Sequence, residues 1–214
     1  KLALFPLHQW LPNAYTYAPP VVSAFLAGTA TKVAYYLLLR FGLAFFGRGS
    51  FFGGIGVEML LLPLSFAGIF LCSIAAIYQS DLKRLLAFSS IAQIGYMTLG
   101  LSLVTVSGVS AGLLHVFNHA LMKGALFMVA ACVAWRIGGT RIEDMRGLGR
   151  SMPLSMAALV VAGLSMVGVP GTAGFVSKWV LVNAALEQGA YAVAGLVLLS
   201  SLLTLVYVWR LVEV

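Results

Sequence analysis

A stripe of three protonatable side chains runs through the apolar segment GLLHVFNHALMKGALFMVAA (112–131). His115, His119 and Lys123 follow one another at a spacing of four residues, which places them on one face of a helix, about 6 Å apart along its axis. Histidine gains and loses a proton near neutral pH, and a lysine deprived of water releases its proton more readily. The stripe therefore predicts a ladder of groups that, bridged by water, pass protons from one to the next.

Two other interpretations of the stripe are open. An isolated histidine in a membrane helix is most often a hydrogen-bonding residue between packed helices, and three bases on one stripe make packing alone a weaker explanation. A metal site is also weak, because no carboxylate or thiolate accompanies the histidines, and Cys72 and Cys132 have no metal-ligand spacing. The sequence contains no flavin, nucleotide or iron–sulfur motif, so we expect neither a metal nor another cofactor.

Three further lysines lie inside or at the edge of apolar stretches. Lys32 is eight residues from Arg40, which leaves it roughly 12 Å below that end of its helix, too deep for its ammonium group to reach water. Lys178 follows a glycine-rich segment by a few residues, and Lys1 precedes FPLHQWLP. A buried membrane charge costs about 2.5–3.5 kcal/mol and is a functional candidate by default. We interpret Lys32 as a proton site, with a hydrogen bond to a neighbouring carbonyl as the alternative.

Membrane helices are the elements that must position these bases. Of the 214 residues, 61% are hydrophobic and 9% are charged, a composition outside the range of soluble domains. Windows of about 20 apolar residues follow one another, and lipid leaves no water to satisfy an unpaired backbone, so the spans should be helical. We expect an all-α polytopic bundle of about six spans that forms one transmembrane domain over residues 1–214. The spans are placed at 19–41, 57–78, 85–104, 109–135, 153–188 and 191–212.

Two helix interruptions are predicted. Residues 1–10 resemble the tail of an interrupted span, a half-helix, followed by the loop LPNAYTYAPP, whose prolines and tyrosines suit a membrane interface. The fifth span is too long for one crossing, and VGVPGTAG (167–174) at its centre contains Pro170, Gly171 and Gly174. We expect a break there. Transporters use such breaks for binding and gating, and a kink with packing value alone is the alternative.

The basic residues outside the spans divide into two groups. If the spans alternate in direction, Arg40 and Arg48 lie at one side of the membrane. Seven lie at the other: Lys83, Arg84, Arg136, Arg141, Arg146, Arg150 and Arg210. The excess of positive charge predicts that the second side faces the cytoplasm. The net charge of +7 is scattered over helices and short loops, which disfavours nucleic acid as a partner.

Carboxylates are missing from the middle of the predicted membrane. Asp81, in SDLKRLL, is expected to cap a helix, and the other acids lie near span ends or in loops. Buried lysines need counter-charges, so the partner acid should come from an upstream segment or from another subunit. The chain also opens at Lys1 without an initiator methionine or a signal peptide, and we expect it to be an internal fragment.

Uncharged polar side chains gather in the span 85–104. Helix packing and support for chains of water molecules are equally good explanations for them. The residues are Ser89, Ser90, Gln93, Tyr96 and Thr98.

Four motifs carry a resemblance to a known family. They are KLALFPLHQWLPNAYTYAPPVVSAFLAGTATKVAYYLLLRF, YQSDLKRLLAFSSIAQIGYM, HVFNHALMKGALF and GVPGTAGFVSKW. In this order they resemble the antiporter-like proton-conducting subunits shared by respiratory complex I, membrane-bound hydrogenases and Mrp-type cation/proton antiporters. The resemblance implies a subunit of about 14 helices built from two inverted five-helix repeats, each with one interrupted helix. This chain would be the C-terminal half, from the broken seventh helix through the thirteenth.

The resemblance also assigns roles to the bases. Lys1 matches the lysine at the seventh-helix break, Lys32 the central lysine of the eighth helix, and Lys178 the lysine or glutamate of the twelfth helix that is assigned to the exit. The family's glutamate on the fifth helix, which pairs with the seventh-helix lysine, would lie upstream of Lys1, in agreement with the missing acid. The connecting polar axis corresponds to His115, His119 and Lys123.

Within the family, the stretch RIEDMRGLGRSMPLSMAALVVAGLSMVGVPGTAGFVSKW looks most like the D-type subunit of Mrp antiporters. The resemblance thus implies a transporter subunit, not an enzyme, in a multisubunit Na⁺/H⁺ antiporter. Its implied partners are other membrane subunits, protons, Na⁺ or another monovalent cation, and the lipid bilayer of the bacterial cytoplasmic (inner) membrane. Two alternatives stay open. One is a proton-pumping subunit of complex I (NADH:quinone oxidoreductase) or of a membrane-bound hydrogenase, and the other is a packing subunit without transport of its own.

Overall fold

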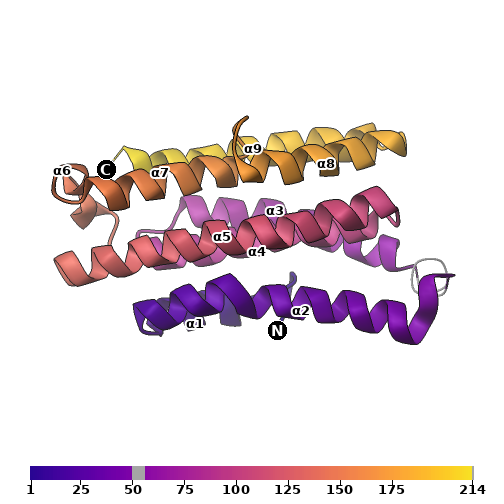
Figure 1. Cartoon of the computed structure of the whole chain (residues 1–214), viewed down its shortest axis with the longest axis horizontal. Helices are drawn as coiled ribbons and strands as arrows, with labels where there is room; N and C mark the ends of the chain where they lie inside the picture. Colours follow the sequence, from indigo (N-terminus) through magenta and orange to yellow (C-terminus); the bar gives the residue numbers. More distant parts are fainter. Residues whose placement is uncertain (50–55, 214) are drawn as a thin grey trace.

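The computed structural model describes the backbone of residues 1–49 and 56–213, and their side chains except those of residues 43, 45–49, 57 and 58. The described residues form a bundle of helices in three layers (Figure 1). One outer layer holds α1 (Trp10–Tyr17) and α2 (Pro20–Gly49), and the middle layer holds α3 (Val57–Ile77), α4 (Leu82–Ser102) and α5 (Val106–Ile137). The other outer layer holds α7 (Pro153–Val167), α8 (Ala173–Glu187) and α9 (Tyr191–Val212), preceded by the short elements η2 (Glu143–Met145) and α6 (Leu148–Ser151). The all-α prediction is confirmed.

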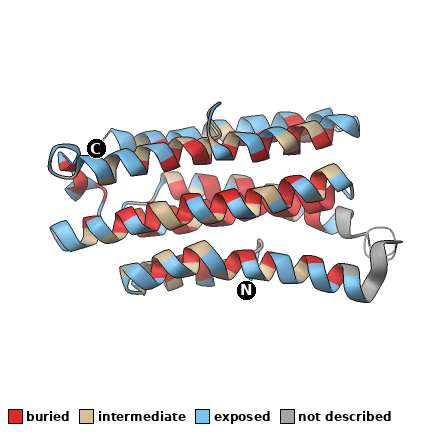
Figure 2. Cartoon of the chain, viewed as in Figure 1, coloured by how far each residue is buried: buried red, intermediate tan, exposed pale blue. Residues whose placement is uncertain are grey.

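The central helix is α4. All of its side chains are buried except those of Arg84 and Phe88. The outer faces of its neighbours instead expose large apolar side chains, such as Phe25, Phe117 and Leu198, as Figure 2 shows by the pale blue outer surfaces. In the described part of the chain α2, α3, α4, α5 and α9 each contain a segment long and apolar enough to cross a bilayer. Apolar side chains thus cover both the interior and the rim of the bundle, as a bilayer requires.

The predicted break in the fifth span separates α7 from α8. Gly168 ends α7 in the left-handed conformation with φ 90°, and its N–H and that of Val169 bond to carbonyls of the last turn. Pro170 has no N–H to continue the helix, and Gly171 also has a positive φ of 89°. The side chain of Thr172 then caps α8 by accepting from the N–H of Phe175. The local sequence therefore determines the interruption at 168–172.

The prediction for the N-terminus placed a half-helix before a loop, and this order is wrong. Residues 1–9 form turns and irregular backbone, and the half-helix α1 begins at Trp10, inside the stretch expected to be a loop. Pro12 is the third residue of α1, where a backbone N–H has no partner within a helix in any case, so proline is tolerated. Burial of Leu11 and Tyr15 in the core then stabilises the short helix.

The seven basic residues expected on one side do lie at one end of the bundle, which we call the basic end. Arg210 donates to the carbonyls of Ile77 and Gln79, which joins the end of α9 to the end of α3. The backbone of Leu82 bonds to Thr140, which brings the segment after α5 to the start of α4. Arg40 lies on α2 toward the opposite end (Figure 1). The side chain of Arg48 is outside the described residues.

The close approach of α7 and α8 leads to a stability prediction. A Cβ atom at Gly174 would lie 1.7 Å from the carbonyl oxygen of Ser165, whereas one at Gly195 in α9 would meet nothing within 4 Å. We expect Gly174→Ala to destabilise the protein by about 1–3 kcal/mol or more, because the two helix ends must separate. Gly195→Ala, the matched control, should be neutral or stabilising by up to about 1 kcal/mol. Thermal unfolding of the detergent-solubilised full-length protein measures both, and equal midpoints would contradict the contact.

Candidate functional site

Five of the six predicted bases are buried inside the bundle. They are Lys32 on α2, His115, His119 and Lys123 on α5, and Lys178 on α8, and the exposed fraction of each is 6% or less. Because α2 packs on α5 and α5 packs on α8, the row crosses the bundle from one outer layer to the other. The predicted common face of the α5 bases is confirmed by their shared burial.

The ammonium groups of Lys32 and Lys123 form the α2 end of the row. Lys32 donates to the carbonyl of Ala27 in its own helix, the kind of bond foreseen as the alternative role for this residue. Lys123 donates to the carbonyl of Leu86, at 2.8 Å, and to the hydroxyl of Ser89, at 2.6 Å, both on α4. Lys32 lies within electrostatic range of Lys123. Two lysines thus face one interior region without being bonded to each other.

The two histidines form the centre of the row. Their rings stack with centroids 6.1 Å apart and planes 3° from parallel. His115 has a partner at each ring nitrogen: Nδ1 lies 2.9 Å from Ser177 Oγ on α8, and Nε2 lies 3.0 Å from Gln93 Oε1 on α4. His119 is fully buried, and among the described residues neither of its ring nitrogens has a hydrogen-bond partner. Such unsatisfied buried nitrogens are rare, and they mark a place where a mobile proton carrier could bind.

The helix break supplies the surroundings of Lys178. Its ammonium group donates to the carbonyls of Met166 and Val167, each at 3.0 Å, in the last turn of α7. It also donates to Ser201 Oγ on α9, at 3.2 Å, and lies 4.6 Å from the centre of the Tyr96 ring. Carbonyls at a helix C-terminus have no partner within the helix and carry partial negative charge, and an aromatic face also attracts a cation. The interruption therefore creates a cation-binding cradle at the far end of the row.

These three ammonium groups have dipoles as partners. Within the described part of the chain, every hydrogen bond that they donate ends on a backbone carbonyl or a hydroxyl oxygen. Buried charges without counter-ions are unstable compared with buried ion pairs, so these ammonium groups depend on the dipoles around them. This arrangement agrees with the missing acid inferred from the sequence.

The structure does not bring Lys1 into the row. Its side chain is exposed and lines a groove with Phe25, Thr29 and Val33 on the outer face of α2, near the middle of that helix. Lys32, by contrast, is buried and does not line this groove. Because residues 1–9 are not helical, they place Lys1 at the middle of α2 but outside the packed interior.

The uncharged polar residues of α4 fall into two groups, those that contact the buried bases and those that do not. Ser89 and Gln93 bind Lys123 and His115, and the ring of Tyr96 lies between His115 and Lys178, with a T-shaped contact of 5.7 Å to the imidazole. The other two serve packing. Thr98 pairs with Ser65 of α3, and Ser90 binds a carbonyl of its own helix.

Two serines were missed by sequence reasoning. Ser177 binds His115, and Ser165 accepts from the N–H of Gly174 and so joins the two helix ends at the break. The only signal for Ser177 is its place beside Lys178, within the first two turns of the predicted second half-helix. Asn118 also ties α5 to the break, through a 2.7 Å bond to the carbonyl of Ala173.

Comparison with known proteins places this arrangement in a family. Residues 1–204 match the family described as NADH:quinone oxidoreductase/Mrp antiporter, TM. The chain belongs to this family. It is therefore a multi-pass membrane protein of the antiporter-like family, as its sequence motifs predicted.

Relatives of two kinds lie within the antiporter-like family. The chain is 48% identical to NADH-quinone oxidoreductase subunit N of Desulforudis audaxviator, over 100% of this chain and 42% of that protein. It is 32% identical to the D-type subunit of the Na(+)/H(+) antiporter of Alkalihalophilus pseudofirmus, over 96% of this chain and 41% of that protein. The chain thus spans about two fifths of the length of these relatives.

Solved structures of antiporter-like subunits show the same fold. A chain of the Mrp complex from a Dietzia species matches with a TM-score of 0.90 and 31% identity, over 99% of this chain and 39% of that chain. A chain of respiratory complex I from Thermus thermophilus with bound aureothin matches with a TM-score of 0.81 and 31% identity, over 99% and 45%. The prediction of a membrane bundle of the antiporter-like type is confirmed.

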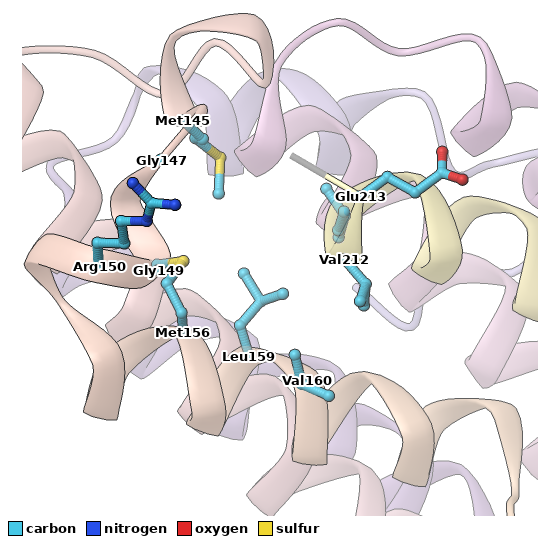
Figure 3. Close-up of a pocket in the computed structure, with 10 residues that line it drawn as sticks. Met145, Gly147, Gly149, Arg150, Met156, Leu159, Val160, Val212 and Glu213 are labelled. Carbon is cyan, nitrogen blue, oxygen red and sulfur yellow. The ribbon is translucent and has the colours of Figure 1, made fainter.

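A pocket at the basic end of this antiporter-like bundle lies apart from the row. It has a volume of about 280 Å³ between the segment 145–150, the first half of α7 and the end of α9. Figure 3 shows Arg150 and Glu213 on opposite sides of it, with the apolar side chains of Met145, Leu159 and Val212 between them. The lining contains none of the buried bases, so the pocket is not the link between them.

A substitution at Lys123 should separate stability from transport in the antiporter-like subunit. Removal of the Lys123 ammonium group would leave none of its acceptors unpaired, because the Leu86 carbonyl also accepts from the hydroxyls of Ser89 and Ser90. Replacing a buried charge by an apolar side chain of similar length is often neutral or stabilising by about 1–4 kcal/mol. We expect Lys123→Met to keep or raise the unfolding midpoint of the solubilised full-length protein. It should lower proton transport in vesicles by about tenfold or more.

The matched control for Lys123→Met is Leu126→Met on the same helix, which changes a buried side chain of this region without touching a base. It should leave both transport and stability nearly unchanged, within about 1.5 kcal/mol. A large loss of stability in Lys123→Met, with transport in proportion to the protein that folds, would show that Lys123 is a structural residue.

Proposed function

We propose that the buried row moves protons across the interior of the protein by alternating protonation of Lys32 and Lys178, linked through Lys123, His119 and His115. One observation carries this proposal: five protonatable bases lie buried in one row across three helices, with dipoles and no carboxylate as the partners of the ammonium groups in the described chain. A packing role explains one such residue, but not a continuous row. Water molecules bound beside His119 would complete the link on the α2 side.

Electrostatic coupling makes such a row respond to events elsewhere. Lys32 lies within electrostatic range of His115, His119 and Lys123, and Lys178 within range of His115. A proton that moves from one base to the next changes the field at its neighbours by several kcal/mol at short range in a low dielectric. Ion movement or a redox reaction in a partner subunit can therefore drive protons through the row. The chain acts as a transporter component and carries out no covalent chemistry of its own.

The comparisons support two candidate complexes. The 48% identity to a subunit N over the whole chain favours a quinone-reducing complex of the complex I type, in which other subunits supply the redox reaction. The sequence resemblance to D-type Mrp subunits and the 0.90 TM-score favour a monovalent cation/proton antiporter, with Na⁺ as the counter-ion. We place the complex I type first because the identity is higher. In either assembly the basic end faces the cytoplasm, and a bacterial cytoplasmic membrane is the expected location.

The first test removes the two terminal lysines. In the full-length protein, assembled in its complex, we expect Lys32→Ala and Lys178→Ala each to reduce proton transport by about tenfold or more, because each substitution removes a terminal base of the row. The ΔpH-dependent dye response of everted membrane vesicles measures transport, and immunodetection of the complex measures assembly. Normal transport in both variants, with normal assembly, would remove the proposed function.

The second test separates a proton site from a structural cation. Arginine is effectively never deprotonated, so Lys178→Arg keeps the charge but blocks reversible protonation, and we expect it to lose transport. Lys83 is the matched control, since its exposed fraction of 5% is close to the 6% of Lys178 and, among the described residues, it donates only to the carbonyls of Thr16 and Ala18 at the basic end. Lys83→Arg should keep transport. If Lys178→Arg also transported normally, the lysine would be a packing residue.

A further inference from the structure

The surroundings of His115 allow its ring to carry the proton on either nitrogen. The Ser177 hydroxyl has two acceptors within reach, the imidazole Nδ1 at 2.9 Å and the carbonyl of Gly174 at 3.1 Å. When it turns to Nδ1 it donates a hydrogen bond to that nitrogen, and when it turns to Gly174 its oxygen can accept a hydrogen bond from the imidazole N–H. A hydroxyl rotates freely between such arrangements, because it is donor and acceptor at once.

Gln93 offers the same choice on the other side of the ring. Its Oε1 lies 3.0 Å from His115 Nε2 and accepts an N–H from it. A half-turn of the terminal amide would exchange oxygen for nitrogen and let Gln93 donate to an unprotonated Nε2. The rotation costs no hydrogen bond of the amide nitrogen, because within the described residues Gln93 Nε2 forms none of good geometry. The Tyr207 hydroxyl of α9, which also lacks one there, interacts with the same amide and can accept or donate in either orientation.

We propose that Ser177 and Gln93 are positioning residues that stabilise both neutral tautomers and the cation of His115, and so let a proton enter at one ring nitrogen and leave from the other. The proposal rests on the proposed function of the row. With the proton on Nε2, that N–H donates a hydrogen bond to Gln93 Oε1, and the Ser177 hydroxyl donates one to Nδ1. A proton released on the Lys178 side binds the Ser177 oxygen while the hydroxyl proton of Ser177 passes to Nδ1, which gives the imidazolium, and the new Ser177 O–H turns to Gly174. Release of the Nε2 proton to a water molecule on the His119 side leaves the Nδ1–H tautomer, and the Gln93 amide turns to donate to Nε2.

The chemistry around the ring favours this exchange over a fixed bond. A histidine held for structure is usually fixed in one tautomer by a carbonyl or carboxylate, groups that only accept. Here both partners can donate and accept, so each protonation state of the ring keeps two hydrogen bonds. The protonatable groups that face His115 are Lys178, Lys32, His119 and Tyr96, and none of them bonds to either ring nitrogen. The ring therefore exchanges protons without losing its orientation.

Two substitutions at Gln93 test the proposal in the assembled full-length protein. Gln93→Glu keeps an acceptor for the Nε2 proton and so preserves a purely structural bond, but an ionised carboxylate cannot donate. We expect transport, relative to the parent at each pH, to fall by about tenfold or more near pH 8. It should recover as the pH is lowered toward about 6, because the protonated carboxyl group can again donate. Gln93→Met, similar in size but without a strong donor or acceptor, should be impaired at every pH without this recovery.

A second pair of variants tests the other side of the ring without adding atoms. Ser177→Ala should lower transport by about tenfold, whereas Ser102→Ala on α4 should not change it, because within the described part of the chain the Ser102 hydroxyl binds only the Leu99 carbonyl of its own helix. Parental transport in Gln93→Glu at all pH values, in Gln93→Met, or in Ser177→Ala would each overturn the proposal. The row itself is tested separately: if Lys178→Ala abolishes transport while these variants are normal, the row stands and tautomer exchange at His115 does not.

Discussion

The whole arrangement depends on how an ammonium group is accommodated in an apolar interior without a carboxylate. An isolated buried charge is unstable by several kcal/mol, so each lysine must be surrounded by oriented dipoles. For Lys178 these are the carbonyls of Met166 and Val167, which are free only because α7 ends there. For Lys123 they come from α4, where a carbonyl and the Ser89 hydroxyl face the lysine. The helix break and the buried polar side of α4 are thus two solutions to one electrostatic problem.

Close backbone contacts keep these dipoles in place. At the break, the N–H of Gly174 bonds to the Ser165 hydroxyl, and the absence of a side chain at Gly174 lets the two helix ends touch. Between the central helices, a Cβ atom at Gly100 would lie 2.6 Å from the carbonyl of Gly108, so α4 and α5 also approach as closely as backbones can. Small residues at helix contacts are the usual source of stability in membranes, where lipid gives apolar side chains no reason to avoid it. The glycines therefore fix the distances across which the bases interact.

The sequence predicted what depends on local chemistry and periodicity. The length of the apolar runs placed the spans, Pro170 and its neighbouring glycines placed the break, and the spacing of four placed His115, His119 and Lys123 on one face. It failed where the outcome depended on packing. Proline in the first turn of α1 was taken for a loop signal, because burial of Tyr15, which makes the short helix stable, is not visible in the sequence. The contacts of His115 with α4 and α8 were beyond prediction for the same reason, since they depend on which faces of three helices meet.

The chemical composition of the row of buried bases is also relevant to the difference between the complex I relatives and the Mrp relatives. Three ammonium groups repel a metal cation, and a hard cation such as Na⁺ prefers a cage of oxygen ligands to imidazole nitrogens. A proton differs because it binds to the bases themselves and needs no cage. If the row moves protons as proposed, it does so in either assembly, and a coupled sodium ion would bind in a different part of the complex. On this argument, a common core serves both complexes, and the partner subunits determine whether an ion gradient or a redox reaction drives the protons.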